Sequence, residues 1–131
     1  MAELCIKQEL PFSAEQVWGV VGVLDRVDWV PGIDQAEMKG DQRHMHMEGA
    51  GDLVETIYHH DPKERVIEYG VTESSVGIQH HRARLAILVS EQNGCEIDWT
   101  LAVEPDAFAG PIKQTMRASI KQLIRVLENG G

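Results

Sequence analysis

The feature that most constrains the fold is one long helical pattern that follows a series of short alternating segments. Apolar residues recur at helical spacing from Phe108 to Leu127, and no other stretch of the chain has a helical pattern of that length. A sheet with one apolar face needs a cover, and only this final helix is long enough to provide it. The sequence therefore predicts an α+β fold, in which a curved seven-stranded antiparallel sheet surrounds a long C-terminal helix.

The strands are predicted from the alternation of apolar and polar residues. Residues 2–10 alternate in this way, and so do residues 95–104, which form the last strand. Turn signals such as Lys39-Gly40-Asp41 and Gln92-Asn93-Gly94 divide residues 33–103 into about six strands. Together with the first strand they make seven.

Two short helices are predicted after the first strand. Ser13 followed by Gln16 has the pattern of a capping box, and the apolar residues of a short helix follow it from Val17 to Leu24. A second helical turn is expected from Leu24 to Trp29, after which Pro31-Gly32 turns the chain into the next strand.

Composition excludes several classes of protein. The 131 residues fit one domain, residues 1–131, and the formal charge of −9 is a poor match to a phosphate backbone, so no nucleic-acid partner is expected. The N-terminus has neither a basic start nor a long apolar run, so we expect no membrane span and a cytoplasmic location. Cys5 and Cys95 fall on opposite faces of the predicted sheet, which predicts no disulfide. A monomer or a homodimer is expected.

Five short stretches resemble a known family in their order and spacing. They are Pro11–Trp18, Trp29–Ile33, Glu55–Asp61, Tyr69–Val71 and Asp98–Trp99. In these stretches the chain resembles the polyketide cyclase/dehydrase and lipid transport group of the START-like (SRPBCC) superfamily, which includes the birch pollen allergen. The resemblance implies a helix-grip fold whose internal cavity holds a hydrophobic small molecule such as a lipid, polyketide or quinone, with no cofactor. Some members catalyse cyclisation or hydrolysis in the same cavity.

The resemblance also implies which face of the sheet lines the cavity. In the segment 52–61 it puts the face that carries Glu55 and Ile57 inward. The loops 48–52 and 74–79 emerge at one end of the predicted sheet and are expected to form the mouth. The ligand-binding residues expected on this basis are Met45, Glu55, Ile57, Tyr69, Val71, His81, Ala83, Leu85, Ile87, Trp99, Leu101, Ile112, Met116 and Ile120.

Glu55, Glu73 and His81 are the candidates for chemistry. A carboxylate in an apolar cavity costs several kcal/mol unless it is protonated or paired, so Glu55 serves the function, pairs with an arginine, or reaches water at the mouth. Hairpin pairing brings Glu73 close to His81, which suits an acid–base pair, but a histidine bonded to water at the rim fits the same pattern. The sequence thus favours binding or transport of a hydrophobic small molecule. The alternative is a cyclase or dehydratase that uses Glu55 or His81 as acid or base.

Two further patterns suggest weaker hypotheses. The histidines occur as pairs at positions 44 and 46, 59 and 60, and 80 and 81, but no spacing supplies three ligands, so no metal site is predicted. A basic row on the last helix can face an anionic partner, acidic residues of the sheet, or solvent. It consists of Lys113, Arg117, Lys121 and Arg125. A protein-interaction module that uses this row or a sheet edge is a third possible function.

Overall fold

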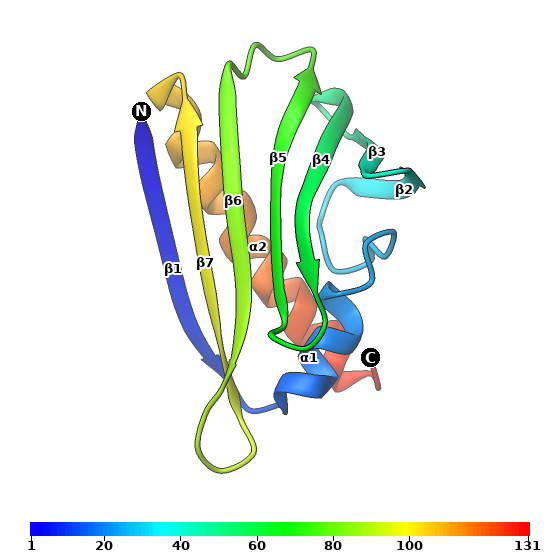
Figure 1. Ribbon diagram of the computed structural model, residues 1–131, viewed down its shortest axis with the longest axis vertical. Coiled ribbons are helices and arrows are strands. Elements are labelled where there is room, and N and C mark those ends of the chain that lie inside the picture. Colours follow the sequence, from blue (N-terminus) through cyan, green and yellow to red (C-terminus); the bar gives the residue numbers. More distant parts are fainter.

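The computed structural model describes residues 1–131 and is built around one antiparallel sheet of seven strands. The strands are β1 (Ala2–Leu10), β2 (Ile33–Lys39), β3 (Gln42–Met47), β4 (Gly51–Asp61), β5 (Val66–Ser74), β6 (His80–Val89) and β7 (Cys95–Glu104). The helices are α1 (Ala14–Val21), the short 3-10 helix η1 (Asp106–Phe108) and α2 (Ala109–Glu128). Figure 1 shows the sheet bending around α2, which crosses it obliquely. The predicted α+β architecture is confirmed.

Strands β2 to β7 form a meander, and the first strand, β1, adds to it beside β7. The order is β1-β7-β6-β5-β4-β3-β2, so every neighbouring pair is consecutive in the chain except β1 with β7. Along β7 the residues with odd numbers from 95 to 103 are buried, and the intervening ones face outward. This is the expected pattern of an antiparallel strand with one face on the core. Neither α1 nor α2 combines the length and the apolar character needed to cross a membrane.

The capping box predicted at the start of α1 is confirmed. The Gln16 backbone N–H donates to Ser13 Oγ (3.1 Å), and the Ser13 backbone N–H donates to Gln16 Oε1 (2.9 Å). Two donors that a helix start would leave unpaired are therefore satisfied by side chains. This local arrangement sets the point at which the chain turns from β1 into α1.

The α1–β2 segment (residues 22–32) does not contain the second short helix predicted from Leu24 to Trp29. It forms isolated turns instead, so that part of the prediction is wrong. A helix needs its carbonyl groups for its own N–H donors four residues on. The Leu24 carbonyl accepts from Arg43 Nη1 (2.9 Å), so a tertiary contact holds this backbone in another conformation.

The pairing of β4 with β5 contains a bulge that decides which residues face inward. Val54 pairs with Glu73, and Glu55 pairs with Val71, so Thr72 is an extra residue on β5. One extra residue moves the side chains that follow it to the opposite face of the sheet. Glu73 consequently lies on the outer face and is exposed.

Candidate functional site

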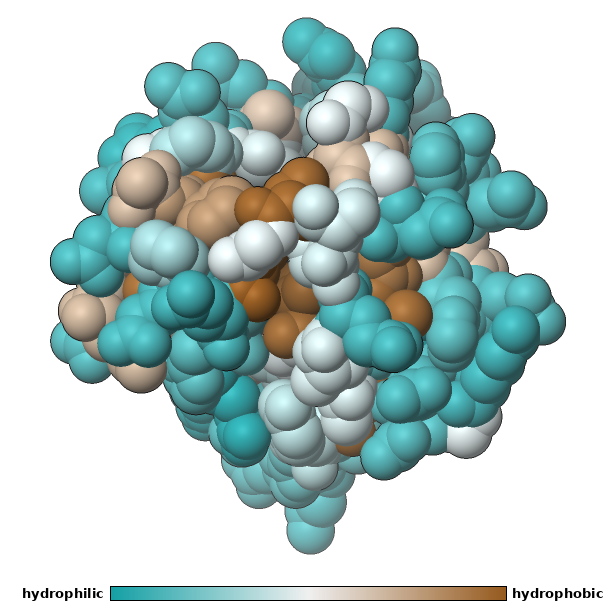
Figure 2. Space-filling model, turned by 90° about the horizontal axis from the view of Figure 1, so that it is seen from above, coloured by the Kyte–Doolittle hydropathy of each residue, from teal (hydrophilic) through white to brown (hydrophobic).

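An open cavity of about 320 Å³ lies between the concave side of the sheet and the N-terminal half of α2. The α1–β2 segment contributes Val27, Trp29 and Val30 to its wall. Twenty of the 27 lining residues are hydrophobic, so the cavity suits a mostly apolar occupant. Figure 2, which looks down on the top of Figure 1, shows brown apolar side chains in a depression surrounded by hydrophilic ones.

Most of the residues predicted to bind a ligand line this cavity. They are Met45, Glu55, Tyr69, Val71, His81, Leu85, Trp99, Leu101, Ile112 and Met116. The other four do not line it. Ala83, Ile87 and Ile120 are almost fully buried in the core, and Ile57 packs against that core. Ile87 and Ile120 lie at the end of the core where the sheet and the helix meet, whereas Ala83 stands between the lining residues His81 and Leu85 on β6.

Small side chains on α2 explain why the other end stays open. Pro111, Thr115 and Ser119 follow one another at intervals of four residues, so they share one face of the helix. Thr115 Oγ1 donates to the Pro111 carbonyl (3.2 Å), and Ser119 Oγ donates to the Thr115 carbonyl (2.8 Å). Because both hydroxyls are satisfied within the helix, this face presents little unpaired polarity to the cavity. Further along α2, Ile120 and Leu123 are large and fill the core.

The expected ligand-binding residues did not include the remaining lining residues. They are Val21, Arg26, Val27, Trp29, Val30, Ile33, Arg43, Met47, Ala50, Leu53, Ile67, Val76, Ile78, Phe108, Pro111, Thr115 and Ser119. Those from the α1–β2 segment had no periodic signal, because the segment is neither helix nor strand. Arg43 did have a periodic signal, since it lies two residues before Met45, which was expected to line the cavity, and therefore shares its face of the strand.

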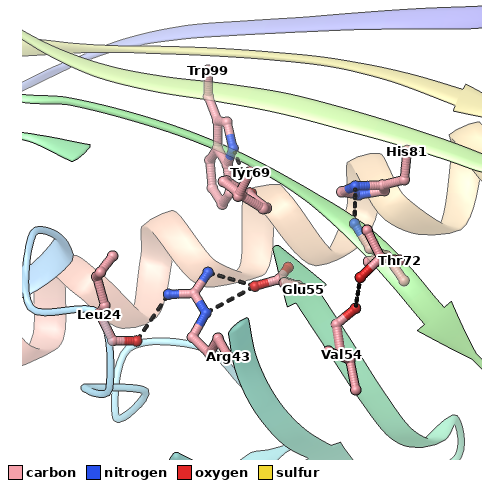
Figure 3. Close-up of polar contacts among 9 residues, drawn as sticks. Leu24, Arg43, Val54, Glu55, Tyr69, Thr72, His81 and Trp99 are labelled. Atoms are coloured by element: carbon pink, nitrogen blue, oxygen red, sulfur yellow. Dashed lines mark hydrogen bonds and ion pairs between the residues drawn. The ribbon is translucent and has the colours of Figure 1, made fainter. Parts of the chain in front are cut away.

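Arg43 and Glu55 form a partly buried ion pair at the wall of the cavity. Glu55 is only 7% exposed and is the direct cross-strand partner of Arg43. Arg43 donates to the same carboxylate oxygen, Glu55 Oε1, from Nε (2.8 Å) and from Nη2 (2.5 Å). Its Nη1 donates to the Leu24 carbonyl, as Figure 3 shows. Of the alternatives considered for Glu55, pairing with an arginine is therefore the one observed.

His81 is held in one tautomer by the backbone. The Val71 N–H donates to His81 Nδ1 (3.1 Å), so Nδ1 accepts and the proton of the neutral ring lies on Nε2. Burial lowers the pKa of His81, and the nearby charge of Glu55 opposes only part of that effect. In this geometry Nε2 is a hydrogen-bond donor and offers no lone pair, so His81 does not fit the role of general base at the cavity.

Tyr69 brings a phenol into the same region. Trp99 Nε1 donates to the Tyr69 hydroxyl oxygen (3.1 Å), and the two rings stand on neighbouring parts of the cavity wall. Burial raises the pKa of Tyr69, and the charge of Glu55 raises it further. The hydroxyl therefore keeps its proton at neutral pH and remains a donor.

The structure does not bring Glu73 and His81 together. The bulge at Thr72 turns Glu73 to the outer face, whereas His81 is 9% exposed and lines the cavity. The acid–base pair expected from regular hairpin pairing is therefore absent. The prediction was wrong because it assumed regular alternation along β5, whereas the extra residue Thr72 changes the face on which Glu73 lies.

The mouth lies between the β3–β4 and β5–β6 connections, close to the start of α2. Ser75 Oγ donates to the Ala50 carbonyl (2.9 Å) and joins the two connections. Val76, 39% exposed, and Ile78 line the cavity from the β5–β6 side. The expectation that these loops emerge at one end of the sheet agrees with this contact.

The structure also shows where the histidine pairs and the basic row of the last helix lie. No group of three or more His, Cys, Asp or Glu side chains is arranged to hold a metal ion. His46 Nδ1 and Asp52 Oδ1 lie 2.9 Å apart on the exposed side of the sheet. The basic row on α2 forms no ion pair with acidic residues of the sheet, and three of its four members are exposed.

The fold of this chain, with a cavity between the sheet and the last helix, is that of a known protein family. The chain matches the family described as polyketide cyclase/dehydrase and lipid transport over residues 1–128. This protein therefore belongs to that family, within the START-like superfamily with the helix-grip fold. No curated protein matches the chain.

Solved structures with the same fold cover almost the whole chain. Protein XoxI from Bacillus cereus is 20% identical, with a TM-score of 0.86 over 96% of this chain and 95% of that one. A START superfamily protein from Mycobacterium smegmatis is 17% identical, with a TM-score of 0.80 over 97% of each chain. Norcoclaurine synthase from Thalictrum flavum, in complex with dopamine and hydroxybenzaldehyde, is 16% identical, with a TM-score of 0.75 over 99% and 88%. At such identities the similarity establishes the fold alone.

The Arg43–Glu55 pair generates a stability prediction. Removing one partner leaves a buried charge, so Arg43→Met or Glu55→Leu should each lower the free energy of unfolding by about 3 kcal/mol or more. The double variant should be more stable than either single one, because no charge is left unpaired. Urea unfolding of the four proteins measures the coupling.

The exposed pair between Arg82 and Glu68 (3.3 Å) is the matched control. The same double-mutant cycle there should give a coupling below about 1 kcal/mol, because solvent screens exposed pairs. Equal coupling at both pairs would contradict the assignment of a buried pair to Arg43 and Glu55.

The environment of His81 predicts a pH dependence of stability. A histidine whose folded-state pKa is lowered stabilises the fold above its ordinary pKa of about 6.5, and that contribution is lost as the pH falls below that value. His81→Asn keeps an acceptor for the Val71 N–H but does not titrate. Its free energy of unfolding should fall less than that of the natural protein between pH 7.5 and 5.5, by at most about 1.4 kcal/mol per pH unit.

His46 is the control for that measurement. Its pKa is raised, first by the hydrogen bond with Asp52, so it stabilises the fold at low pH and loses that contribution as the pH rises. His46→Asn should therefore steepen the loss of stability on acidification. A His81→Asn variant that steepens it too would contradict the lowered pKa of His81.

Proposed function

We propose that this protein binds a predominantly apolar small molecule in the cavity between the sheet and α2, as a carrier or binding protein. The observation that carries the proposal is the open cavity of about 320 Å³ in which most lining residues are hydrophobic. Ligand pockets in proteins commonly have a few hundred Å³, mostly apolar walls and a few convergent polar groups. Glu55, Tyr69 and His81 are among the polar groups here, together with Arg26, Arg43, Thr115 and Ser119.

Family membership supports the same conclusion at a coarser level. The family description includes lipid transport, and a protein of similar fold, norcoclaurine synthase, has been solved with two small organic molecules. The walls of the cavity also contain rigid aromatic surfaces, because Trp29 and Trp99 lie with ring centroids 5.9 Å apart. Such surfaces pack well against a flat apolar ligand.

Blocking the cavity tests the proposal. The neutral fluorescent probe N-phenyl-1-naphthylamine should bind with a Kd on the order of 10–100 μM, as expected for about 17 non-hydrogen atoms. Thr115→Trp, which adds an indole to the cavity wall, should weaken this binding at least tenfold. The neighbouring exposed Gln114 does not line the cavity, so Gln114→Trp should leave binding unchanged. Equal binding by both variants, or none by the natural protein, would overturn the proposal.

A proton-transfer enzyme is the second candidate function. One observation favours it: no hydrogen bond reaches Glu55 Oε2, so this oxygen can accept a proton from a bound carbon acid. Two observations oppose it. Arg43 already engages the Glu55 carboxylate through two hydrogen bonds to Oε1, and the tautomer of His81 offers no lone pair to a ligand.

Deuterium exchange separates the two functions. A carrier should not accelerate exchange of the acidic C–H groups of 2-tetralone, measured by NMR in deuterated buffer. If Glu55 is a base, the natural protein accelerates exchange, Glu55→Gln abolishes the acceleration, and Glu73→Gln on the outer face retains it. Acceleration that follows this pattern would replace binding by catalysis as the function.

A further inference from the structure

We infer that the ligand is uncharged and that its apolar skeleton carries a hydroxyl group, which binds Glu55, Tyr69 and His81. This inference deepens the proposed function and rests on it. It follows from how the charges of the cavity are paired and from which polar atoms of its wall have no partner.

The arginines of the cavity wall are both neutralised by carboxylates. Arg43 is paired with Glu55, and Arg26 makes two bonds to Asp28, from Nε (2.8 Å) and from Nη2 (2.9 Å). The wall therefore offers no uncompensated positive charge to hold a carboxylate or a phosphate. Moving an ionised group from water into such a cavity is unfavourable without an opposite charge. An uncharged ligand avoids that penalty.

The wall presents one acceptor without a partner. Arg43 directs both of its bonds to Oε1 of Glu55, and no hydrogen bond reaches Oε2. Figure 3 shows Glu55 beside Arg43, with the rings of Tyr69 and His81 above it. Glu55 is only 7% exposed, so a donor for Oε2 comes from the contents of the cavity, either water or a ligand.

Two donors face the same region without an acceptor. The Tyr69 hydroxyl oxygen accepts from Trp99, but its own proton has no partner. The Nε2–H of His81 has none either, since only Nδ1 is bonded. Both residues are 9% exposed, and their ring centroids are 6.0 Å apart. The charge of Glu55 acts on the pKa of both groups, as expected for neighbours.

A hydroxyl group is the simplest group that satisfies all three atoms. It donates one hydrogen bond, which suits Glu55 Oε2, and its oxygen accepts from Tyr69 and His81. An ether cannot donate, an ammonium group cannot accept, and a carboxylate both lacks a proton and is repelled by Glu55. The remaining wall is mostly hydrophobic, so the rest of the ligand is apolar.

Four compounds with one skeleton test the inference at pH 7 by displacement of N-phenyl-1-naphthylamine. They are 2-naphthol, 2-methoxynaphthalene, 2-naphthoate and protonated 2-naphthylmethylamine. 2-Naphthol should bind about tenfold or more tightly than each of the others, because a hydrogen bond to a charged, buried carboxylate is among the stronger ones. Equal affinity for 2-naphthol and its methyl ether, or tighter binding of 2-naphthoate, would overturn the inference.

Charge removal provides a second test with a matched control. Glu55→Gln leaves Arg43 without a counter-charge, so the affinity for 2-naphthoate relative to 2-naphthol should rise at least tenfold. Glu73→Gln makes the same change on the outer face and should keep the natural order. If Glu55→Gln does not fold, the order of the four compounds on the natural protein decides alone. Binding of the fluorescent probe without this order contradicts only the inference, whereas no binding of any compound contradicts the proposed function.

Discussion

A single helix has to cover a seven-stranded sheet, and the rest of the structure depends on this constraint. With 20 residues, α2 is about 30 Å long and about 10 Å wide, whereas seven strands spaced about 4.8 Å apart span about 29 Å. One helix therefore covers about a third of that width. Curvature of the sheet and the α1–β2 segment must cover the remainder, and the cavity lies where their cover is incomplete.

The same constraint separates the packed part of the interior from the polar part. α2 packs beside β1, at one edge of the sheet order, and its large residues Ile120 and Leu123 complete the core there. Arg43 and Glu55 stand on β3 and β4, toward the other edge, where the cover comes from the α1–β2 segment. An irregular segment leaves backbone carbonyls unpaired, and a guanidinium group can satisfy them. The polar residues of the cavity therefore lie where the irregular α1–β2 segment covers it, because Arg43 bonds a backbone carbonyl of that segment.

Periodic parts of the sequence predicted the fold well, and the failures have specific physical causes. The strands, the capping box at Ser13 and the last helix depend on local patterns, and these were found. The second short helix failed because Arg43 takes the Leu24 carbonyl, a contact between residues 19 positions apart. Glu73 was misplaced because the bulge at Thr72 leaves no mark in the alternation of polar and apolar residues. The partner of Glu55 was within reach, since Arg43 shares the strand face of Met45, and a buried arginine is normally paired with a carboxylate.

The Arg43–Glu55 pair also bears on why the cavity keeps its shape. A buried ion pair is often no more stabilising than an apolar pair of similar volume, so folding alone does not require it. Its geometric consequence is more specific, because Arg43 joins β4 through Glu55 to the α1–β2 segment through the Leu24 carbonyl. An apolar pair would fill space at this point but could not bond that carbonyl. One guanidinium group therefore both fixes the cover of the cavity and leaves a carboxylate oxygen free within it, so the shape of the site and its polarity have the same origin.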